Sequence, residues 1–225
     1  MKILDVPQVG KLGLIVGQGG RFGQIRRTYV IPANPRTVDQ MSTRRDLSQV
    51  ASSWRSLTKD QQTAWITAAS TVQSVRKGGT QGPLTGTQLY TKINCVNLLA
   101  GNPLVQAPPN KPDIGPAVAT GLAITNTAGV VALSVTIATA APSGNPYIVR
   151  ASAPQSFGIN AVPALSVLGV ISPSAAGATD ITALYNAKYG APQAGQQVWV
   201  AVSATQEGWE DLPSTFVQVV PASGS

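Results

Sequence analysis

The side chains of this chain that could do chemistry are mostly arginines, because the usual catalytic and metal-binding residue types are scarce. The sequence has no His and one Cys, which removes the commonest general base, the usual zinc ligand and every Ser-His-Asp or Cys-His arrangement. The single Cys95 forms neither an internal disulfide nor a Cys-based zinc site. No three polar residues meet the requirements for a nucleophile, a base and an oxyanion site. The sequence therefore predicts a protein that is not an enzyme, with no catalytic residue, metal site, cofactor or small-molecule substrate.

Arginines of the N-terminal half form the main charge cluster and are the candidate assembly or phosphate contacts. They are Arg21, Arg26, Arg27, Arg36, Arg44 and Arg45. The planar guanidinium binds oxyanions in pairs, so these side chains suit phosphate as well as carboxylate. Three interpretations are open: contact with DNA without sequence reading, pairing with acidic patches of a neighbouring subunit, or a solvated basic face. If all of them met phosphates, binding would weaken with salt at a slope of roughly −0.9 per contact.

Six further residues that could carry chemistry are interpreted as having a structural or surface role. The acids are Asp180, Glu207, Glu210 and Asp211. They offer fewer oxygen ligands than calcium needs, so we expect them to be surface residues of loops. Cys95 follows an apolar stripe and is expected as a buried small hydrophobe. Trp209 stands between Gly208 and Glu210. It is interpreted either as an exposed ring of a binding surface or as a side chain that closes the end of the C-terminal domain.

Composition and charge divide the 225-residue chain into unlike halves. Charged residues make up 11% of it, against roughly 25% in typical soluble domains, so its surface must be rich in uncharged polar residues. Up to Ala100 there are 13 Lys and Arg against 4 Asp and Glu, and beyond it 3 against 5. This asymmetry predicts a basic, partner-facing module joined to a nearly neutral one. No apolar stretch approaches the roughly 20 residues that span a bilayer, so no membrane insertion is expected.

The first elements that position these arginines are a hairpin and a helix. Residues 9–31 hold two β-rich runs around Gly17-Gln18-Gly19-Gly20, which predicts a glycine-rich hairpin turn. A helix can start after residues 34–37, and its apolar residues follow three-to-four spacing. Two more helices complete a helical module over residues 34–100.

The second helix has the clearest local signals. Thr58 with Gln61 is a capping-box pattern, and the Arg-Lys-Gly-Gly run at 76–79 is expected to end the helix. The third helix is expected over residues 87–100. The expected helical core consists of Trp54, Leu57 and Trp65.

After the helices the pattern changes to short alternating strands. Residues 101–116 carry five prolines and predict a stiff extended linker. The strand candidates beyond it cover residues 121–125, 130–139, 146–153, 165–172, 197–204 and 215–220. Their spacing predicts an antiparallel β-sandwich with Trp199 as core anchor.

The expected fold class is therefore α+β with two domains: a glycine-rich hairpin plus a three-helix module, and an antiparallel β-sandwich. The expected ranges are a hairpin arm at 1–33, a helical module at 34–100, a linker at 101–116, a sandwich at 117–222 and a tail at 223–225.

The C-terminal residues resemble the last two strands of a fibronectin type III domain. The resemblance is carried by residues 198–204, then Gln206-Glu207-Gly208, then Leu212-Pro213-Ser214 before another strand. It covers roughly residues 117–222 and implies a spacer or adhesive module. The tryptophan usual in the second strand of that family is absent from residues 130–139, so an immunoglobulin-like sandwich of another topology stays open.

The positions of the N-terminal half that carry a resemblance are Arg36-Thr37, Gln40, Arg44, Trp54-Arg55-Ser56-Leu57-Thr58, Gln61, Trp65, Ala68-Ala69, Gly86, Tyr90, Asn94 and Gly101. In these positions the chain is similar to uncharacterised proteins encoded among the structural genes of tailed phages and prophages. That group combines a glycine-rich start, a helical middle and a fibronectin-like end, so the resemblance covers nearly the whole chain. It implies a structural virion protein, associated with the capsid or the tail, and no catalytic residue.

A second resemblance is to the HMG box, whose helix-turn-helix spacing fits Trp54, Leu57, Trp65 and Ala69. The basic N-terminal strand with an apolar wedge that bends DNA in that family is not recognisable here. The same spacing arises whenever two helices pack around a capped turn.

The expected function is thus a non-enzymatic virion protein, made in the host cytoplasm without a signal peptide. Its expected partners are other virion proteins and further copies of itself, with possible non-specific DNA contact. The residue 9–25 hairpin is the candidate for edge-to-edge pairing with a neighbour. The alternatives are an HMG-box-like or electrostatic DNA-binding protein, and a bacterial surface or filament subunit.

Overall fold

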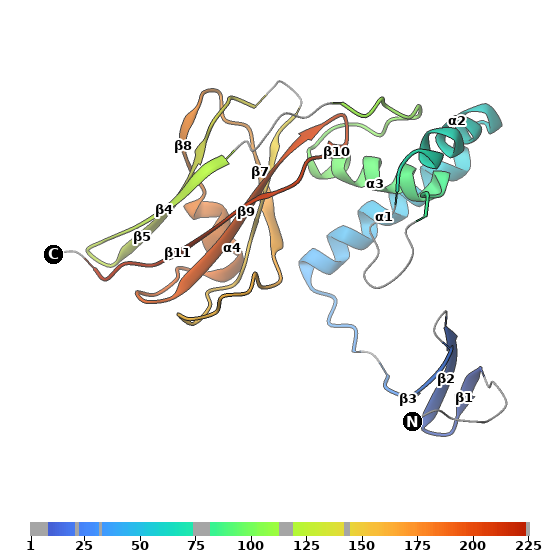
Figure 1. Cartoon of the computed structure of the whole chain (residues 1–225), viewed down its shortest axis with the longest axis horizontal. Coiled ribbons are helices and arrows are strands. Elements are labelled where there is room, and N and C mark those ends of the chain that lie inside the picture. The colour runs from blue at the N-terminus through green and yellow to red at the C-terminus, as the bar shows by residue number, and fades with distance from the viewer. Residues whose placement is uncertain are drawn as a thin grey trace. The chain divides into compact units, whose positions relative to one another are not determined.

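The computed structural model describes residues 9–20, 23–31, 33–73, 82–112, 119–141 and 145–223. Its helices and antiparallel sheets make the fold α+β, as expected (Figure 1). By its internal contacts the chain divides into two compact units, Met1–Ser42 and Thr43–Ser225. This division differs from the expected boundaries after residues 33, 100 and 116. The independent folding of the expected modules stays a prediction.

The first unit contains a three-stranded antiparallel sheet, which we call the N-terminal sheet. Its strands are β1 (Gly10–Leu12), β2 (Ile15–Gly20) and β3 (Gly23–Thr28), in that order across the sheet. The expected turn at Gly17–Gly20 was wrong, because these residues belong to β2 and pair with β3. The turn that sequence reasoning missed is at Gly13 and Leu14, where Gly13 has a φ of 61°. A glycine suits that left-handed conformation, since it has no Cβ to clash.

Three helices follow, α1 (Val38–Ser56), α2 (Lys59–Ser70) and α3 (Gly86–Leu99). The predicted capping box of α2 is confirmed, with Gln61 N donating to Thr58 Oγ1 at 3.3 Å and Thr58 N donating to Gln61 Oε1 at 2.9 Å. Thr85 and Gln88 form the same box at α3. The two reciprocal bonds satisfy backbone donors that a helix start leaves unpaired.

Helix α2 ends earlier than expected. Its last residue is Ser70, and Val72 instead accepts a backbone hydrogen bond from Leu84 at 2.9 Å. The chain leaves the helix here because Gln73 bridges to Pro83. The stop expected at 76–79 lies outside the described residues.

Packing of the helices is close at one glycine. A Cβ added to Gly86 would lie 2.8 Å from Ile66 Cγ1 and 3.0 Å from the Ile66 backbone nitrogen. Only glycine therefore lets the start of α3 approach α2 so closely.

The expected linker is not a free spacer in its described part. Val105 N donates to Asn94 Oδ1 at 2.8 Å, and Trp65 Nε1 donates to the Gln106 carbonyl at 2.8 Å. Leu104 and Val105 pack against the helical core. The segment is better described as a strap over the helices, because its backbone groups satisfy buried side chains from α2 and α3.

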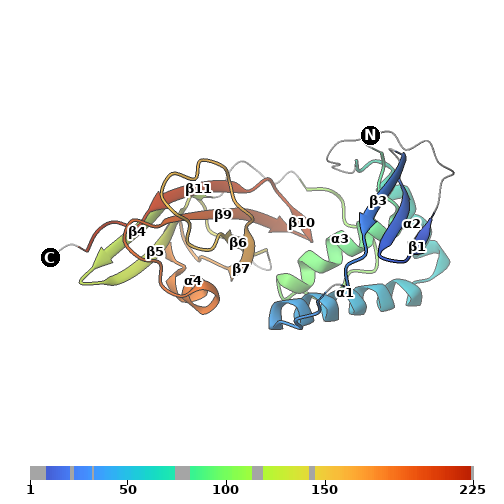
Figure 2. The ribbon, with the colours of Figure 1, turned by 90° about the horizontal axis from the view of Figure 1, so that it is seen from below.

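Two antiparallel sheets form the C-terminal sandwich (Figures 1 and 2). One sheet contains β4 (Ala119–Thr127), β5 (Val130–Ile137) and β8 (Gly177–Asp180), in that order. In the other, β9 (Gln197–Gln206) pairs with β6 (Tyr147–Ala151), and β6 pairs with β7 (Ser166–Ile171). On its other side β9 pairs with β11 (Ser214–Val219) and, at its end, with β10 (Trp209–Glu210). All six predicted strands are present, and β8 and β10 were missed.

The sandwich core lies between the sheets and is made largely of aliphatic side chains, among them Leu133, Val135, Val149, Val200 and Val202. Trp199 is not one of these residues. It is only 8% exposed, but side chains alternate along a strand, so it points away from the face that carries Val198 and Val200. Trp199 is therefore buried, as expected, yet on the face of β9 opposite the core.

A short helix that the sequence did not predict, α4 (Thr182–Tyr189), lies against one side of the sandwich (Figure 2). It contacts β5 and β7, and Tyr185 Oη donates to the Ser152 carbonyl at 3.1 Å. Lys188 Nζ donates to the Val167 carbonyl of the edge strand β7 at 2.8 Å. The helix thus covers part of a sheet edge that would otherwise expose polar backbone groups.

Candidate assembly surface

The N-terminal sheet leaves its apolar side chains uncovered. Leu12 is 71% exposed and Ile15 49%, and Val9, Leu14, Ile25, Val30 and Ile31 are also exposed. Among the residues from 9 to 49 whose side chains are described, none is buried. A three-stranded sheet needs an apolar face packed on something to be stable by itself. This sheet therefore has the composition of a surface that another molecule covers.

The strand register separates the sheet into two unlike faces. Leu12 lies opposite Ile15, and Gly10 opposite Gly17. Gly17 in turn faces Arg26, and Ile15 faces Thr28. Directly opposed residues point to the same face, so these six residues form one face, which we call the glycine face. Lys11, Val16 and Arg27 lie on the other face.

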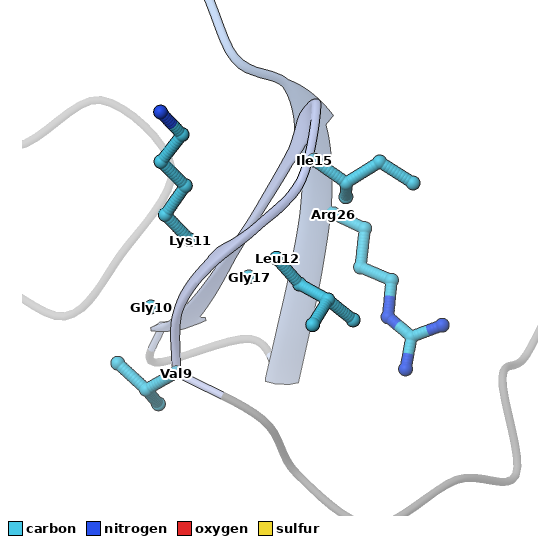
Figure 3. Close-up of a pocket in the computed structure, with 7 residues that line it drawn as sticks. All are labelled: Val9, Gly10, Lys11, Leu12, Ile15, Gly17 and Arg26. Atoms are coloured by element: carbon cyan, nitrogen blue, oxygen red, sulfur yellow. The ribbon is translucent and has the colours of Figure 1, made fainter.

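A hollow of about 250 Å³ lies on the glycine face, lined by Val9, Gly10, Lys11, Leu12, Ile15, Gly17 and Arg26. Figure 3 shows Leu12, Ile15 and Arg26 projecting to one side of the sheet, while Lys11 projects to the other. The hollow exists because Gly10 and Gly17 place no side chain beside the Leu12 and Ile15 pair. Its walls are apolar on one side and carry a guanidinium on the other.

The opposite face carries Lys11, Val16 and Arg27, with Gln18 opposite Ile25. Lys11 Nζ lies 3.8 Å from the centroid of the Tyr29 ring, a cation–π contact. Arg27 lies on this face beside Val16. The two faces therefore offer different chemistry, one with an apolar hollow and the other with a stacked cation.

The predicted arginines that the structure describes belong to several elements. Arg26 and Arg27 are on opposite faces of β3. Arg36 precedes α1 with a φ of 50°, and Arg44 is exposed on α1. Arg45 pairs with its neighbour Asp46 at 3.1 Å. Arg21 lies outside the described residues. Such scattered cations favour contacts with several points of a partner over one phosphate-binding pocket.

The helical module differs from the sheet, because part of it forms a buried core within the chain, although Val38, Met41 and Leu47 of α1 are exposed. Trp65 is fully buried and Leu57 nearly so, with Trp54 half-buried at the edge of the same cluster. The ring of Tyr90 lies 5.1 Å from Trp65 in an edge-to-face arrangement and 5.2 Å from Trp54. The expected core residues are thus gathered around an aromatic centre that sequence reasoning had not singled out.

The last component of this cluster is Trp209, which comes from β10 at the end of the sandwich. Trp209 is 6% exposed and packs with Leu89, Ile93 and Trp65 in the helical cluster. Its Nε1 donates to the Pro109 carbonyl of the strap at 3.4 Å. Both interpretations from the sequence were wrong, because the ring neither lies exposed nor closes the sandwich. It joins the sandwich to the helices (Figure 1).

A tight turn and an ion pair hold the Trp209 hairpin. Glu207 and Gly208 have φ values of 49° and 81°, the pattern of a type I′ hairpin turn. A Cβ on Gly208 would lie 2.6 Å from both Ile93 Cγ2 and the Ile93 carbonyl oxygen. Glu210, expected as a surface acid, instead binds the Arg150 guanidinium through both oxygens and accepts a hydrogen bond from Ser203 Oγ at 2.6 Å.

Three other titratable groups have shifted pKa values that their surroundings in the fold explain. Cys95 is half-buried and not fully buried as expected, and burial, followed by the charge of Asp46, raises the pKa of its thiol. Burial followed by the nearby Tyr189 raises the pKa of Tyr185. Hydrogen bonds from the Thr182 side chain and backbone lower the pKa of exposed Asp180. These groups stabilise α3 and α4 and do not converge on a common cavity.

Within the part of the chain that the structure describes, no three His, Cys, Asp or Glu side chains converge as metal ligands. In the same residues, no helix combines the length and the apolar character needed to cross a bilayer. Comparison with protein families, with curated proteins and with solved structures gave no match.

Proposed function

We propose that this chain is a non-enzymatic structural protein that joins a larger assembly through its N-terminal sheet. The observation that carries the proposal is that most described apolar side chains in residues 9–31 are exposed, including Leu12, Leu14 and Ile25, and that none is buried. Exposed apolar surface of this kind marks contact sites between proteins. The cations on both faces add attraction for an acidic partner.

The protein-binding function is favoured over DNA binding by the kind of surface exposed. Phosphates would neutralise Arg26 and Arg27 but would leave Leu12 and Ile15 in water. A protein partner would cover both the cations and the apolar side chains. Arg26 and Arg27 lie on opposite faces of β3, which also suits a sheet that a partner encloses on both faces.

The C-terminal region serves, in this proposal, as a fibronectin type III-like spacer. What supports this finer fold is the strand order: the first, second and fifth strands form one sheet, and the third, fourth, sixth and seventh form the other if β10 is left aside. The fourth strand, β7, pairs with the third, β6, and not with the fifth as in a constant-type immunoglobulin sandwich. A spacer module needs no pocket and agrees with an uncharged polar surface.

The assembly we propose is the virion of a tailed phage or prophage, in the capsid or the tail. Support comes from the resemblance of the N-terminal residues to uncharacterised phage structural proteins, combined with an uncovered sheet and a spacer-like sandwich. Other virion proteins and further copies of the chain are the proposed partners.

The test is deletion of residues 1–33 in the native host, followed by gradient purification of particles and immunoblotting. The deletion leaves both hydrophobic clusters of Thr43–Ser225 intact, so the shortened protein is expected to fold but to be absent from particles. A matched control is the full chain with Leu212→Ser, which changes an 85% exposed side chain of the sandwich and should leave incorporation unchanged. Incorporation of the shortened protein at the normal level would contradict the proposal.

A further inference from the structure

The glycine face of the N-terminal sheet carries a ridge of side chains beside a hollow. The ridge is the pair of opposed side chains Leu12 and Ile15, and the hollow is the neighbouring pair Gly10 and Gly17. The two pairs are two residues apart along the strands, or about 6.8 Å at the usual antiparallel rise. The sheet therefore contains, side by side on one face, a shape and its complement.

From this arrangement we infer that the occupant of the glycine face is the same face of a second copy of this chain. A two-fold axis parallel to the sheet, perpendicular to the strands and midway between the two pairs, would interchange ridge and hollow. Leu12 of one copy would lie over Gly10 of the other, and Ile15 over Gly17. Such an interface is isologous, because both copies use the same residues.

The third strand satisfies the same symmetry. Thr28 is level with Ile15, and Arg26 is level with Gly17. The two-fold operation would place Thr28 of one copy over Arg26 of the other, so that a hydroxyl meets a guanidinium. The two Arg26 side chains lie at the border of the sheet, where solvent screens their mutual repulsion. The edge strand β3 stays open for other components of the assembly.

The size of the face determines how strong the pairing can be. Three strands about 4.8 Å apart and about 20 Å long form a patch well below the 800 Å² per partner of a stable complex. Pairing through this face is therefore expected to be weak between isolated protomers and effective where an assembly holds many copies close together. Covalent trapping at high protein concentration is the appropriate measurement.

The experiment uses the full chain with Cys95→Ala, so that only introduced thiols react. Ile15→Cys and Gly17→Cys variants with different affinity tags are mixed at high concentration and mildly oxidised, and disulfide-linked heterodimers are counted. Gly17 does not have a positive φ, so a Cys residue can adopt the same backbone conformation. The matched control is the mixture of Val16→Cys with Gln18→Cys, which has the same strand and spacing but the opposite face.

The inference predicts that the 15/17 mixture yields heterodimers at least about tenfold above the 16/18 mixture and above either glycine-face variant alone. Equal crosslinking on both faces, or no crosslinking on the glycine face, would overturn it. A second measurement is sedimentation equilibrium of Gly17→Val, which fills the hollow. It should weaken self-association about tenfold or more, whereas Gln18→Val should not; equal effects would count against the pairing.

The inference rests on the proposed function, and the two fail separately. If deletion of residues 1–33 removes the protein from particles but the crosslinks show no preference for the glycine face, the sheet binds a different protein and only the two-fold pairing is wrong. If duplex DNA binds the full chain and loses affinity on Arg26→Glu while crosslinks are absent, DNA is the occupant. If the deletion changes nothing, the assembly function itself is wrong.

Discussion

The N-terminal sheet and the helical module are both too small to cover their own apolar residues, and they differ in what covers them. In the helical module the cover is supplied by the same chain, through Trp209 of the sandwich and the strap around Val105. In the sheet none of the described apolar side chains is buried. The helices and the sandwich thus share a buried contact within the second unit, and in our proposal the sheet is covered by another molecule.

The two regions also use glycine in opposite ways. Gly208 and Gly86 permit close contact inside the second unit, since a Cβ at either position would collide with α3 or α2. Nothing lies within 4 Å of the Cβ position of Gly10. The space beside Gly86 and Gly208 is filled by a neighbouring element, whereas the space beside Gly10 is empty. The open space beside Gly10, next to the exposed Leu12 side chain, is where side chains of a binding partner could pack.

Trp209→Ala should have the largest effect on this comparison. Removing a buried aromatic ring from a core costs about 3–5 kcal/mol, and here it also removes the connection between helices and sandwich. We expect a lower free energy of unfolding and separate transitions, that of the helices followed by circular dichroism at 222 nm and that of the sandwich by hydrogen exchange of peptides from β9. Leu212→Ala is the control and should change stability by less than about 0.5 kcal/mol. A single transition with an unchanged midpoint would show that Trp209 does not stabilise the contact between the helices and the sandwich.

Gly208→Ala should have the next largest effect. The new Cβ meets Ile93 at 2.6 Å in a residue with a φ of 81°. Gly195→Ala has nearly the same backbone conformation, with a φ of 80° and nothing within 4 Å of its Cβ. Both variants carry the strain of positive φ, about 1 kcal/mol, so any difference between them measures the contact with α3. We expect Gly208→Ala to lose about 1–3 kcal/mol more in urea unfolding; equal losses would show that the hairpin does not press on α3.

Glu210→Gln tests the ion pair that holds the hairpin. The side chains of Arg150 and Glu210 are 24% and 21% exposed, so the variant leaves a largely buried guanidinium without its carboxylate. A loss of about 1–3 kcal/mol is expected, measured by urea unfolding. Asp211→Asn, one residue further along, is the matched control and should have little effect. A neutral Glu210→Gln would mean that Trp209 alone holds the hairpin.

Leu12→Ser combined with Ile15→Ser should have the smallest effect on stability and still remove assembly. Both side chains are mostly in water, so unfolding of the second unit should change by less than about 0.5 kcal/mol. Incorporation into particles should fall strongly, because the ridge of the glycine face is lost. A clear loss of thermal stability would contradict this prediction, because it would mean that the sheet is covered within its own chain.

Local signals in the sequence were sufficient for much of the fold. The capping box of Thr58 and Gln61 and the apolar stripes predicted α2 and α3, and alternation predicted six strands, because these patterns depend on near neighbours. The box of Thr85 and Gln88 was equally readable and was missed. Helix α4 was not readable in this way, since it has eight residues and no side-chain cap on Ile181.

The candidate surface was less predictable, because it depends on distant contacts. The glycine run of β2 was interpreted as a turn, since glycine favours turns and only pairing with β3 makes these residues a strand. Trp209 packs against residues more than a hundred positions earlier, and no local pattern reports that contact. The six arginines were identified by type, but their distribution over opposite faces follows from the register of the strands.

The central claim is that the helical module has a buried core supplied within the chain around α3, whereas the described residues of the N-terminal sheet have none. Hydrogen–deuterium exchange of the full chain, at low and high protein concentration, tests it most directly by comparing peptides from residues 10–28 and 86–99. We predict protection of α3 at both concentrations, with β1–β3 exchanging rapidly when dilute and becoming protected when concentrated. Strong protection of β1–β3 in dilute protein, equal to that of α3, would contradict the claim.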